Sequence, residues 1–380
     1  MNYYIITTRI FNLELKKFNI GGIQTYIQSL YALISSKGHN VFIVQFCSCQ
    51  KEELIRYDHI NVLLIPLKKS FFKSSMQATF DFFYKRNNQP NSHFIIDTDQ
   101  YDICSKGDNV TQIQHGIAFD IPGNMIKGFW GKAKLFQHVY KILVCLKNSR
   151  RLYNTRNTVC VDYNFYNWFR TLGTIYSGWN IKVIPNFSSG TISQSELSAK
   201  LEMNDKTVRV LFARRFFDYR GTLIMIEAVK KILEKYDNAY FTFAGGGPLE
   251  QAIIDSFKDN EKVTLTSFKP DESVHFHKKY DIAVVPTIFS EGTSLSLSEA
   301  MSAGCVVIAT HVGGMTNMIL DSFNGFLIEP SADSLIKKLE YVITMPIDEK
   351  RRIIRNAYES SLYSFSKAKW CNQWVEYLHL

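Results

Sequence analysis

The sequence lacks any uninterrupted apolar run of about 20 residues, the length that a membrane-spanning helix requires. Its first ten residues have the alternating pattern of a strand, without the charged and apolar segments of a secretory signal. It also lacks the paired cysteines of a zinc site or a disulfide framework, since its seven cysteines are an odd number and only Cys47 and Cys49 lie close together. These absences favour a cytoplasmic protein.

Acidic residues are missing from residues 121–161, where eight of the nine surplus positive charges lie. This basic segment contains Lys127, Lys132, Lys134, Lys141, Lys147, Arg150, Arg151 and Arg156. Apolar residues are interspersed over residues 132–153, so a helix there would be amphipathic. Two interpretations stay open: a surface helix whose apolar face packs inward, or a surface for anionic lipid or a lipid diphosphate acceptor. We expect no nucleic-acid partner, because no stacking platform or nucleic-acid motif is present.

The length of 380 residues exceeds what one core usually holds and predicts two domains. Short apolar runs alternate with segments of helical spacing, which is typical of doubly wound α/β domains. The expected strands are residues 3–8, 41–46, 62–65, 94–96, 110–114, 159–161, 182–184, 208–212, 240–244, 263–266, 282–285 and 306–309.

Residues 281–314 form the most informative stretch, with the pattern strand, polar loop, helix, strand. The helix begins near Ser294, and the backbone N–H groups at a helix start bind anions such as phosphate. Those groups would come from Gly292, Thr293, Ser294 and Leu295. Glu291 precedes this anion site and Glu299 follows it, and carboxylates accept hydrogen bonds from hydroxyls. Hydroxyls on both sides of a diphosphate describe a nucleotide sugar.

The spacing of Glu291 and Glu299 within SEGTSLSLSEAMSAG resembles the E-x7-E signature of the retaining family-four glycosyltransferases. GGGPLE (residues 245–250) and GCVVIATHVGG (residues 304–314) occur at the spacing of that family, so the resemblance is strongest over residues 208–330. It implies a GT-B fold of two Rossmann-like domains facing a cleft. It also implies hexose transfer from a nucleotide diphosphate sugar with retention, without metal, cofactor or protein nucleophile.

The domain limits follow from the same resemblance. We expect an acceptor-side domain at residues 1–187, a linker at 188–207, a nucleotide-sugar domain at 208–365, and a last helix at 366–380 returning to the first domain. The family often has V-I-P-N-G-(I/V)-D at the end of the first domain, whereas this chain has VIPNFSSG. The family also often has a glycine where this chain has Ser267, so the sequence does not predict which nucleotide base the donor carries.

Further site residues are implied by motif position. Gly21, Gly22 and Gly247 lie in glycine turns that approach the donor diphosphate, and His115 follows a strand and is expected to face the donor sugar. Arg215 and Arg220 match the spacing of the family's diphosphate-binding Arg and Lys, although Arg214 could replace Arg215. We expect Glu291 to hold sugar hydroxyls and Glu299 to hold ribose hydroxyls.

The acceptor side is less determined. Asp120, Lys127, Lys132 and Lys134 are possible contacts with an acceptor or a membrane. The amino-acid composition suggests an AT-rich bacterial genome, in which such enzymes commonly build surface polysaccharide on a lipid carrier at the inner leaflet of the cytoplasmic membrane.

Three alternatives remain. Asp97-Thr98-Asp99 follows a strand as the metal-binding D-x-D motif of GT-A enzymes does. A GT-B relative could instead hydrolyse or epimerise a nucleotide sugar. A basic, non-enzymatic module that binds membrane or nucleic acid is the third.

Overall fold

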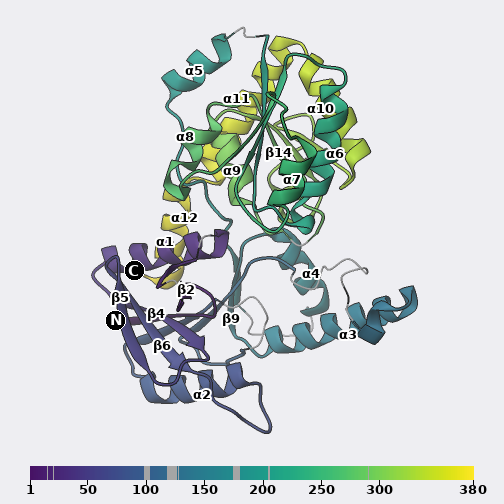
Figure 1. Ribbon diagram of the computed structural model, residues 1–380. Helices are drawn as coiled ribbons and strands as arrows, with labels where there is room; N and C mark the ends of the chain where they lie inside the picture. The colour runs from purple at the N-terminus through teal and green to yellow at the C-terminus, as the bar shows by residue number, and fades with distance from the viewer. Residues whose placement is uncertain are drawn as a thin grey trace. The chain divides into compact units, whose positions relative to one another are not determined.

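The computed structural model divides into two units, each built on one large sheet, and the first also has the small antiparallel pair β2-β3 (Figure 1). The first unit comprises Met1–Ile184 and Trp374–Leu380, and the second comprises Pro185–Gln373. The structure describes residues 1–14, 16–19, 21–97, 103–117, 126, 128–173, 180–203, 206–289 and 291–380. Within these ranges, no helix is both long and apolar enough to cross a membrane.

The first unit contains an eight-stranded sheet in the order β10-β9-β8-β7-β1-β4-β6-β5. All neighbouring strands are parallel except β5, which pairs antiparallel with β6. Its elements are β1 (Asn2–Thr7), β2 (Phe11–Asn12), β3 (Lys17–Phe18), α1 (Gly22–Ser36), β4 (Asn40–Cys47), β5 (Glu53–Tyr57), β6 (Ile60–Pro66), α2 (Ser75–Asn87), β7 (Ser92–Ile96), β8 (Val110–Gln114), η2 (Gly128–Gly131), α3 (Lys134–Tyr153), β9 (Asn157–Cys160), α4 (Tyr163–Gly173) and β10 (Asn180–Val183).

Aromatic side chains hold α2 against this sheet. Phe80 and Phe83 of α2 are buried, and the rings of Phe83 and Tyr4 on β1 form a T-shaped pair with 5.3 Å between centroids. Tyr4 in turn stacks on Phe94 of the neighbouring strand β7 at 5.2 Å. Such ring contacts stabilise a core beyond the apolar area that they bury, so this end of the sheet is fixed by side chains of three separate elements.

The second unit contains a six-stranded parallel sheet in the order β13-β12-β11-β14-β15-β16. Its elements are α5 (Gln194–Glu202), β11 (Val208–Ala213), η3 (Asp218–Arg220), α6 (Thr222–Leu233), β12 (Ala239–Ala244), α7 (Glu250–Ser256), β13 (Val263–Thr266), η4 (Pro270–Glu272), α8 (Ser273–His277), β14 (Ile282–Val285), α9 (Leu295–Ser302), β15 (Val306–Thr310), η5 (Gly313–Asn317), β16 (Phe326–Ile328), α10 (Ala332–Thr344), α11 (Ile347–Ser364) and α12 (Lys367–Leu378). The strands β14 and β15 are buried along their whole length, as helices on both faces of a parallel sheet require.

The segment expected to be a linker, residues 188–207, contains the helix α5. A capping box begins this helix, in which the Ser193 hydroxyl accepts from the Glu196 backbone N–H while the Glu196 carboxylate accepts from the Ser193 N–H. Leu197 and Leu201 of α5 are buried in the core of the second unit. Because α5 has so short an apolar face, its sequence shows little helical periodicity, and the Ser-rich composition suggested a linker instead.

The last helix, α12, contributes to both units. Trp370 packs on Phe187 of the second unit, with 4.5 Å between the ring centroids. In the first unit, Trp374 is fully buried and its Nε1 donates to the Tyr26 hydroxyl at 3.0 Å. Each tryptophan therefore anchors its own part of α12 within one unit.

Candidate functional site

The carboxyl ends of β11 and β14 carry the main polar cluster of the second unit. These strands are hydrogen-bonded neighbours, so the segments that follow them emerge at the same edge of the sheet. Arg214 directly follows β11, and the loop after β14 carries Thr287 and Glu291 before α9 begins. Parallel topology thus brings together side chains that are more than 70 positions apart in the chain.

Arg214 is the centre of this cluster. Its side chain is only 6% exposed. Nη1 donates to the hydroxyls of Ser294 and Ser296, each at 2.9 Å. Nη2 donates to Oε2 of Glu291 at 2.7 Å and to the Thr287 hydroxyl at 2.9 Å. The guanidinium therefore fixes the loop after β14 and the first turn of α9 to the end of β11.

Glu291 lies between two arginines. Its Oε2 accepts from Arg214, from Nη1 of Arg220, and from the Thr287 hydroxyl at 3.1 Å. Burial by itself raises the pKa of the Glu291 carboxyl, but the two guanidiniums outweigh burial and hold that pKa below its ordinary value. Among the described residues, Oε1 of Glu291 has no hydrogen-bond partner. This ionised carboxylate keeps one oxygen for a hydroxyl donor.

Two glycines bring backbone close to the cluster. Gly313 has a φ of +55°, and a Cβ there would lie 2.0 Å from the carbonyl oxygen of Glu291, to which Gly314 N–H donates at 2.8 Å. Gly247 has a φ of +153°, and a Cβ there would lie 2.7 Å from the carbonyl oxygen of Phe216. At Gly247, which the sequence placed in a glycine turn, and at Gly313, the missing Cβ lets two backbone segments pack closely.

The start of α9 has the features of an anion site. Ser294 is its N-cap residue, but the Ser294 hydroxyl is engaged with Arg214 and does not cap the helix. Thr293 is fixed to Asn186, whose backbone N–H donates to the Thr293 hydroxyl at 2.8 Å and whose side chain donates to the Thr293 carbonyl at 2.5 Å. Gly292 is buried and Leu295 begins the helix. First-turn N–H groups without a side-chain cap, next to two arginines, suit a phosphate.

Glu299 lies one turn further along α9 and has a different environment. The residue is 8% exposed, and its carboxylate accepts from the Ser273 hydroxyl at 2.6 Å. Burial raises the pKa of Glu299 to about 7, although the Ser273 hydrogen bond opposes this shift. Among the described residues, no cation is paired with Glu299. The two carboxylates of the E-x7-E pattern therefore differ in charge state near neutral pH.

Arg215 does not join this cluster. Its side chain is exposed, lies 5.4 Å from the Phe217 ring centroid and donates to the Tyr219 hydroxyl at 3.3 Å. The structure thus brings Arg214 and Arg220 to Glu291 and leaves Arg215 outside. Motif spacing alone cannot tell which of these two adjacent arginines turns inward. The hydroxyl groups of two serines and a threonine after β14 accept hydrogen bonds from Arg214 and thereby select it.

A second polar cluster lies at the carboxyl edge of the first sheet. His115 follows β8, and its Nε2 lies 2.6 Å from Oδ1 of the buried Asp97, which follows β7. The rings of Tyr26 and His115 form a T-shaped pair with 5.1 Å between centroids. Asp162, after β9, accepts from Phe165 N–H at 2.7 Å, and burial raises its pKa to about 6 while His115 acts in the opposite sense. Strand alternation predicted the place of His115 but not its two acidic neighbours.

The other expected residues of the first unit have simpler positions. Gly21 precedes α1 and Gly22 begins it. Lys132 and Lys134 are exposed. Asp99, Asp120 and Lys127 lie outside the described residues. Oδ1 of Asp97 is engaged with His115, and the D-x-D alternative stays a prediction because Asp99 is not described.

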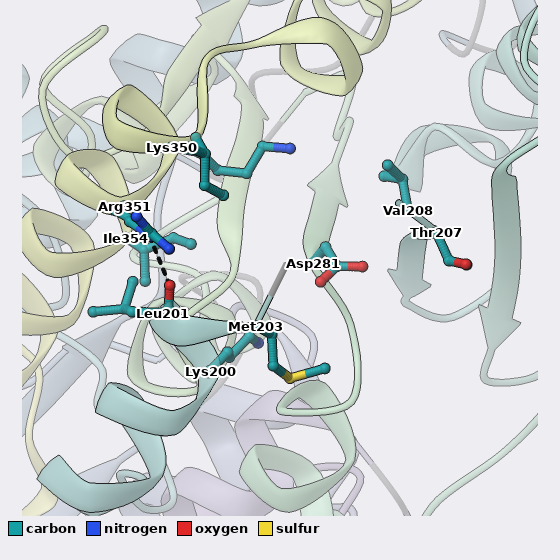
Figure 2. A pocket seen from close by; sticks show the side chains of 10 residues that line it. Lys200, Leu201, Met203, Thr207, Val208, Asp281, Lys350, Arg351 and Ile354 are labelled. Atoms are coloured by element: carbon teal, nitrogen blue, oxygen red, sulfur yellow. Dashed lines mark hydrogen bonds between the residues drawn. The ribbon is translucent and has the colours of Figure 1, made fainter. Parts of the chain in front are cut away.

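A hollow in the second unit lies away from these residues, at the amino ends of β11 and β14. Figure 2 shows Lys200, Asp281 and Arg351 among the side chains around it. Arg351 Nε donates to the Leu201 carbonyl at 2.7 Å, and Lys200 Nζ donates to the Tyr280 and Ala303 carbonyls at 2.6 and 3.1 Å. These two cations are engaged with backbone carbonyls, and the hollow is separate from the Glu291 cluster at the carboxyl ends of the strands.

Comparison with known proteins finds a family model that matches part of the second unit. The model of the family described as Glycosyl transferases group 1 matches residues 193–360, which contain every member of the Glu291 cluster. The Lipopolysaccharide 1,2-N-acetylglucosaminetransferase of Salmonella typhimurium is 25% identical over 50% of this chain, and the match spans about half (54%) of that protein. The UDP-Gal:alpha-D-GlcNAc-diphosphoundecaprenol alpha-1,3-galactosyltransferase of Escherichia coli is 23% identical over 78% of this chain and 83% of its own length.

Solved structures give the fold. The sucrose-phosphate synthase of Thermosynechococcus elongatus superposes with a TM-score of 0.70 over 100% of this chain and 98% of its own, at 14% identity. HepE of Anabaena, solved in complex with UDP, superposes with a TM-score of 0.69 over 100% of both chains, also at 14% identity. The two Rossmann-like units are those of a GT-B fold, as the sequence predicted.

Proposed function

Because residues 193–360 form a Glycosyl transferases group 1 domain on a GT-B fold, we propose that this protein is a retaining glycosyltransferase. It moves a hexose from a nucleotide diphosphate sugar to a hydroxyl of a lipid-linked glycan, in the synthesis of a cell-surface polysaccharide. The observation that carries the proposal is the cluster of Arg214, Arg220 and Glu291 beside the uncapped start of α9.

The donor diphosphate suits this edge of the second sheet. Arg214 and Arg220 bring two positive charges to the start of α9, whose N–H groups add the positive end of the helix dipole. As the bond between the anomeric carbon and the diphosphate breaks, negative charge builds on the leaving group. Cations and N–H groups that are already in place stabilise that charge without reorganising.

Each glutamate has a separate role in the proposal. The open Oε1 of Glu291 accepts from sugar hydroxyls, and the two arginines keep this carboxylate ionised. Glu299 accepts from ribose hydroxyls, and Ser273 holds its carboxyl group in place. His115 orients the sugar, and Asp97 fixes the ring of His115.

The reaction needs no protein nucleophile in this scheme. The acceptor hydroxyl attacks the anomeric carbon from the side that the diphosphate leaves, and a phosphate oxygen of the donor takes the hydroxyl proton. One carbon–oxygen bond forms, one breaks, and the configuration is retained. We further propose that the reaction proceeds without a metal ion and takes place in the cytoplasm, at the inner leaflet of the membrane.

Donor binding provides the test. A panel of UDP-, GDP-, ADP- and dTDP-sugars is added to the full chain, with and without EDTA, and the melting temperature is recorded. A ligand that binds only the folded protein raises this temperature. We expect a shift with one nucleotide family that EDTA leaves unchanged. No shift with any donor contradicts the transferase proposal, and a shift that EDTA abolishes contradicts metal-independent binding.

Product analysis separates transfer from the alternatives. Hydrolysis releases free sugar without an acceptor, and epimerisation changes the sugar while it remains on the nucleotide. Neither outcome is compatible with the proposal if it accounts for most of the donor that is consumed in the presence of acceptor.

A further inference from the structure

The helix α3 of the first unit carries an exposed apolar stripe. The five side chains of this stripe are Leu135, Val139, Ile142, Leu143 and Leu146, which are 70%, 38%, 58%, 50% and 57% exposed. At 3.6 residues per turn they fall on one face of the helix. The opposite face, with the buried Asn148, is the one that packs against the protein, and η2 and α4 are the neighbours of α3 (Figure 1). The apolar face therefore does not pack inward.

Positive charges border the stripe. By the same helical spacing, the exposed Lys147 falls beside the stripe and the exposed Arg150 continues it, whereas Lys134 and Lys141 fall in line with Asn148 on the opposite face. No acidic residue occurs between positions 121 and 161 to neutralise them. An apolar face flanked by cations is the pattern of helices that lie in the interface of an anionic membrane.

Aromatic rings stand at the beginning of the stripe. Phe129 of η2 is 58% exposed and stacks on Phe136 of α3, with 4.6 Å between centroids. Trp130 lies 6.0 Å from the ring of Tyr140. Tryptophan and tyrosine favour the boundary between water and hydrocarbon, so these rings extend the surface rather than interrupt it.

A loop elsewhere in the first unit has the same character. Phe71 and Phe72, between β6 and α2, are fully exposed at 102% and 99%. The Ser70 hydroxyl accepts from the backbone N–H groups of Phe72 and Lys73 at 3.3 and 3.2 Å, which turns the chain at this tip. Lysines at positions 68, 69 and 73 flank the two rings. Two adjacent phenylalanines outside any core are costly in water and need a partner.

We propose that the first unit docks on an anionic lipid surface through the α3 stripe and the Phe71–Phe72 tip. This inference rests on the proposed function, because it names the surface that brings the unit to a lipid-linked acceptor. A second copy of this chain is a poorer occupant of the α3 face, since it would bring the same uncompensated cations. Nucleic acid would leave the aliphatic stripe in water.

Vesicle flotation tests the inference on the full chain. We expect binding to vesicles of equimolar phosphatidylcholine and phosphatidylglycerol, and much weaker binding to phosphatidylcholine alone. A variant with both Lys147→Gln and Arg150→Gln should lower partitioning about twenty-five-fold, because each cation near an anionic surface contributes roughly a fivefold factor. High salt should reduce the binding of the unaltered chain in the same way.

Apolar variants test the two contact points separately. One variant carries Leu135→Gln, Ile142→Gln and Leu146→Gln, and the other carries Phe71→Ser and Phe72→Ser. Both sets are exposed, so we expect normal melting temperatures and an affinity for mixed vesicles that is lower by at least about tenfold. The matched control carries Leu54→Gln, Ile254→Gln and Leu320→Gln, which are 57%, 42% and 66% exposed and lie outside both surfaces.

Several results would overturn the inference. One is a failure of the chain to bind vesicles, or equal binding to neutral and anionic vesicles. Another is a loss of affinity for vesicles in the control variant that is as large as the loss in the two apolar variants. Binding of RNA in preference to vesicles, or loss of a dimer in the stripe variant without loss of vesicle binding, would assign the surface to another partner. The nucleotide-sugar thermal shift is measured on the same samples: vesicle binding without that shift contradicts only the transferase, and the shift without vesicle binding contradicts only the docking surface.

Discussion

Replacing Glu291 with Ala tests the electrostatics of the cluster. The substitution removes the carboxylate that both Arg214 and Arg220 contact. Arg214 keeps its hydroxyl partners but loses its only anionic partner among the described residues, while its side chain stays 6% exposed. Two guanidiniums are then held close together without a counter-charge. Breaking a buried ion pair in this way costs about 3–5 kcal/mol.

This cost should appear as a lower melting temperature. For a unit of this size, about 1 kcal/mol corresponds to roughly 2–4 °C. At about 3 kcal/mol, Glu291→Ala should therefore lower the melting transition of the second unit by roughly 6–12 °C. Differential scanning calorimetry of the full chain measures it. Transfer should also fall by orders of magnitude, at a temperature where the variant is still folded, because the open oxygen for the sugar hydroxyl is lost.

A matched control lies in the same unit. Glu234 pairs with Lys231 on α6 at 3.0 Å, but the two side chains are 61% and 57% exposed. Such surface pairs contribute at most about 1 kcal/mol, so Glu234→Ala should hardly change the transition. If Glu291→Ala melts within about 2 °C of the unaltered protein, as the control does, the two arginines do not depend on Glu291 and the reasoning is wrong.

Three further predictions concern charge and position. Glu299→Gln should weaken donor binding, which would be seen as a raised donor KM. The same residue should make stability depend on pH, because burial raises its pKa in the folded protein to about 7. Its contribution to the free energy of unfolding is present below the ordinary glutamate pKa and is lost as pH rises towards 7, by about 3 kcal/mol in total. The melting temperature of the unaltered chain relative to Glu299→Gln should thus fall between about pH 5 and pH 8, and a constant difference would contradict the shift. Asp97→Asn should lower kcat by on the order of tenfold and change the pH profile of transfer, because the partner of His115 loses its charge; an unchanged profile would leave Asp97 a purely structural role. Arg214→Lys should reduce kcat/KM far more than Arg215→Lys, because a lysine cannot bridge Ser294, Thr287 and Glu291 as a guanidinium does; equal losses would argue against Arg214 as the diphosphate ligand.

The fold was largely predictable because parallel strands buried on both faces leave a simple pattern. The runs at residues 282–285 and 306–309 are continuously apolar, and the structure has β14 and β15 there, both fully buried. The segment at residues 188–207 was harder, because α5 has only nine residues and buries only two leucines. A short helix with a small apolar face gives little periodicity to read.

The site was predictable in outline but not in its contacts. E-x7-E identified Glu291 and Glu299, yet their opposite pKa shifts depend on tertiary packing. Arg214 and Arg220 hold the pKa of Glu291 low, whereas burial raises the pKa of Glu299 against the effect of its Ser273 hydrogen bond. Sequence spacing also cannot show which of two adjacent arginines turns inward. That choice is made by the hydroxyl groups after β14, which only the folded sheet brings to Arg214.

The exposed apolar surfaces depend on tertiary packing in the same way. The sequence of α3 predicts an amphipathic helix equally well for inward and outward apolar faces. Phe71 and Phe72 do not stand out in a chain with 28 phenylalanines until the structure shows that they have no core to join.

The most direct test of the central claim is the stereochemistry of transfer. The full chain is incubated with the α-linked nucleotide sugar that shifts its melting temperature and with a polyprenyl diphosphate-linked saccharide, and the new linkage is examined by NMR. The account predicts one added hexose, an α linkage and one nucleoside diphosphate released per transfer. A β linkage would contradict retention, and free sugar as the main product in the presence of acceptor would contradict transfer itself.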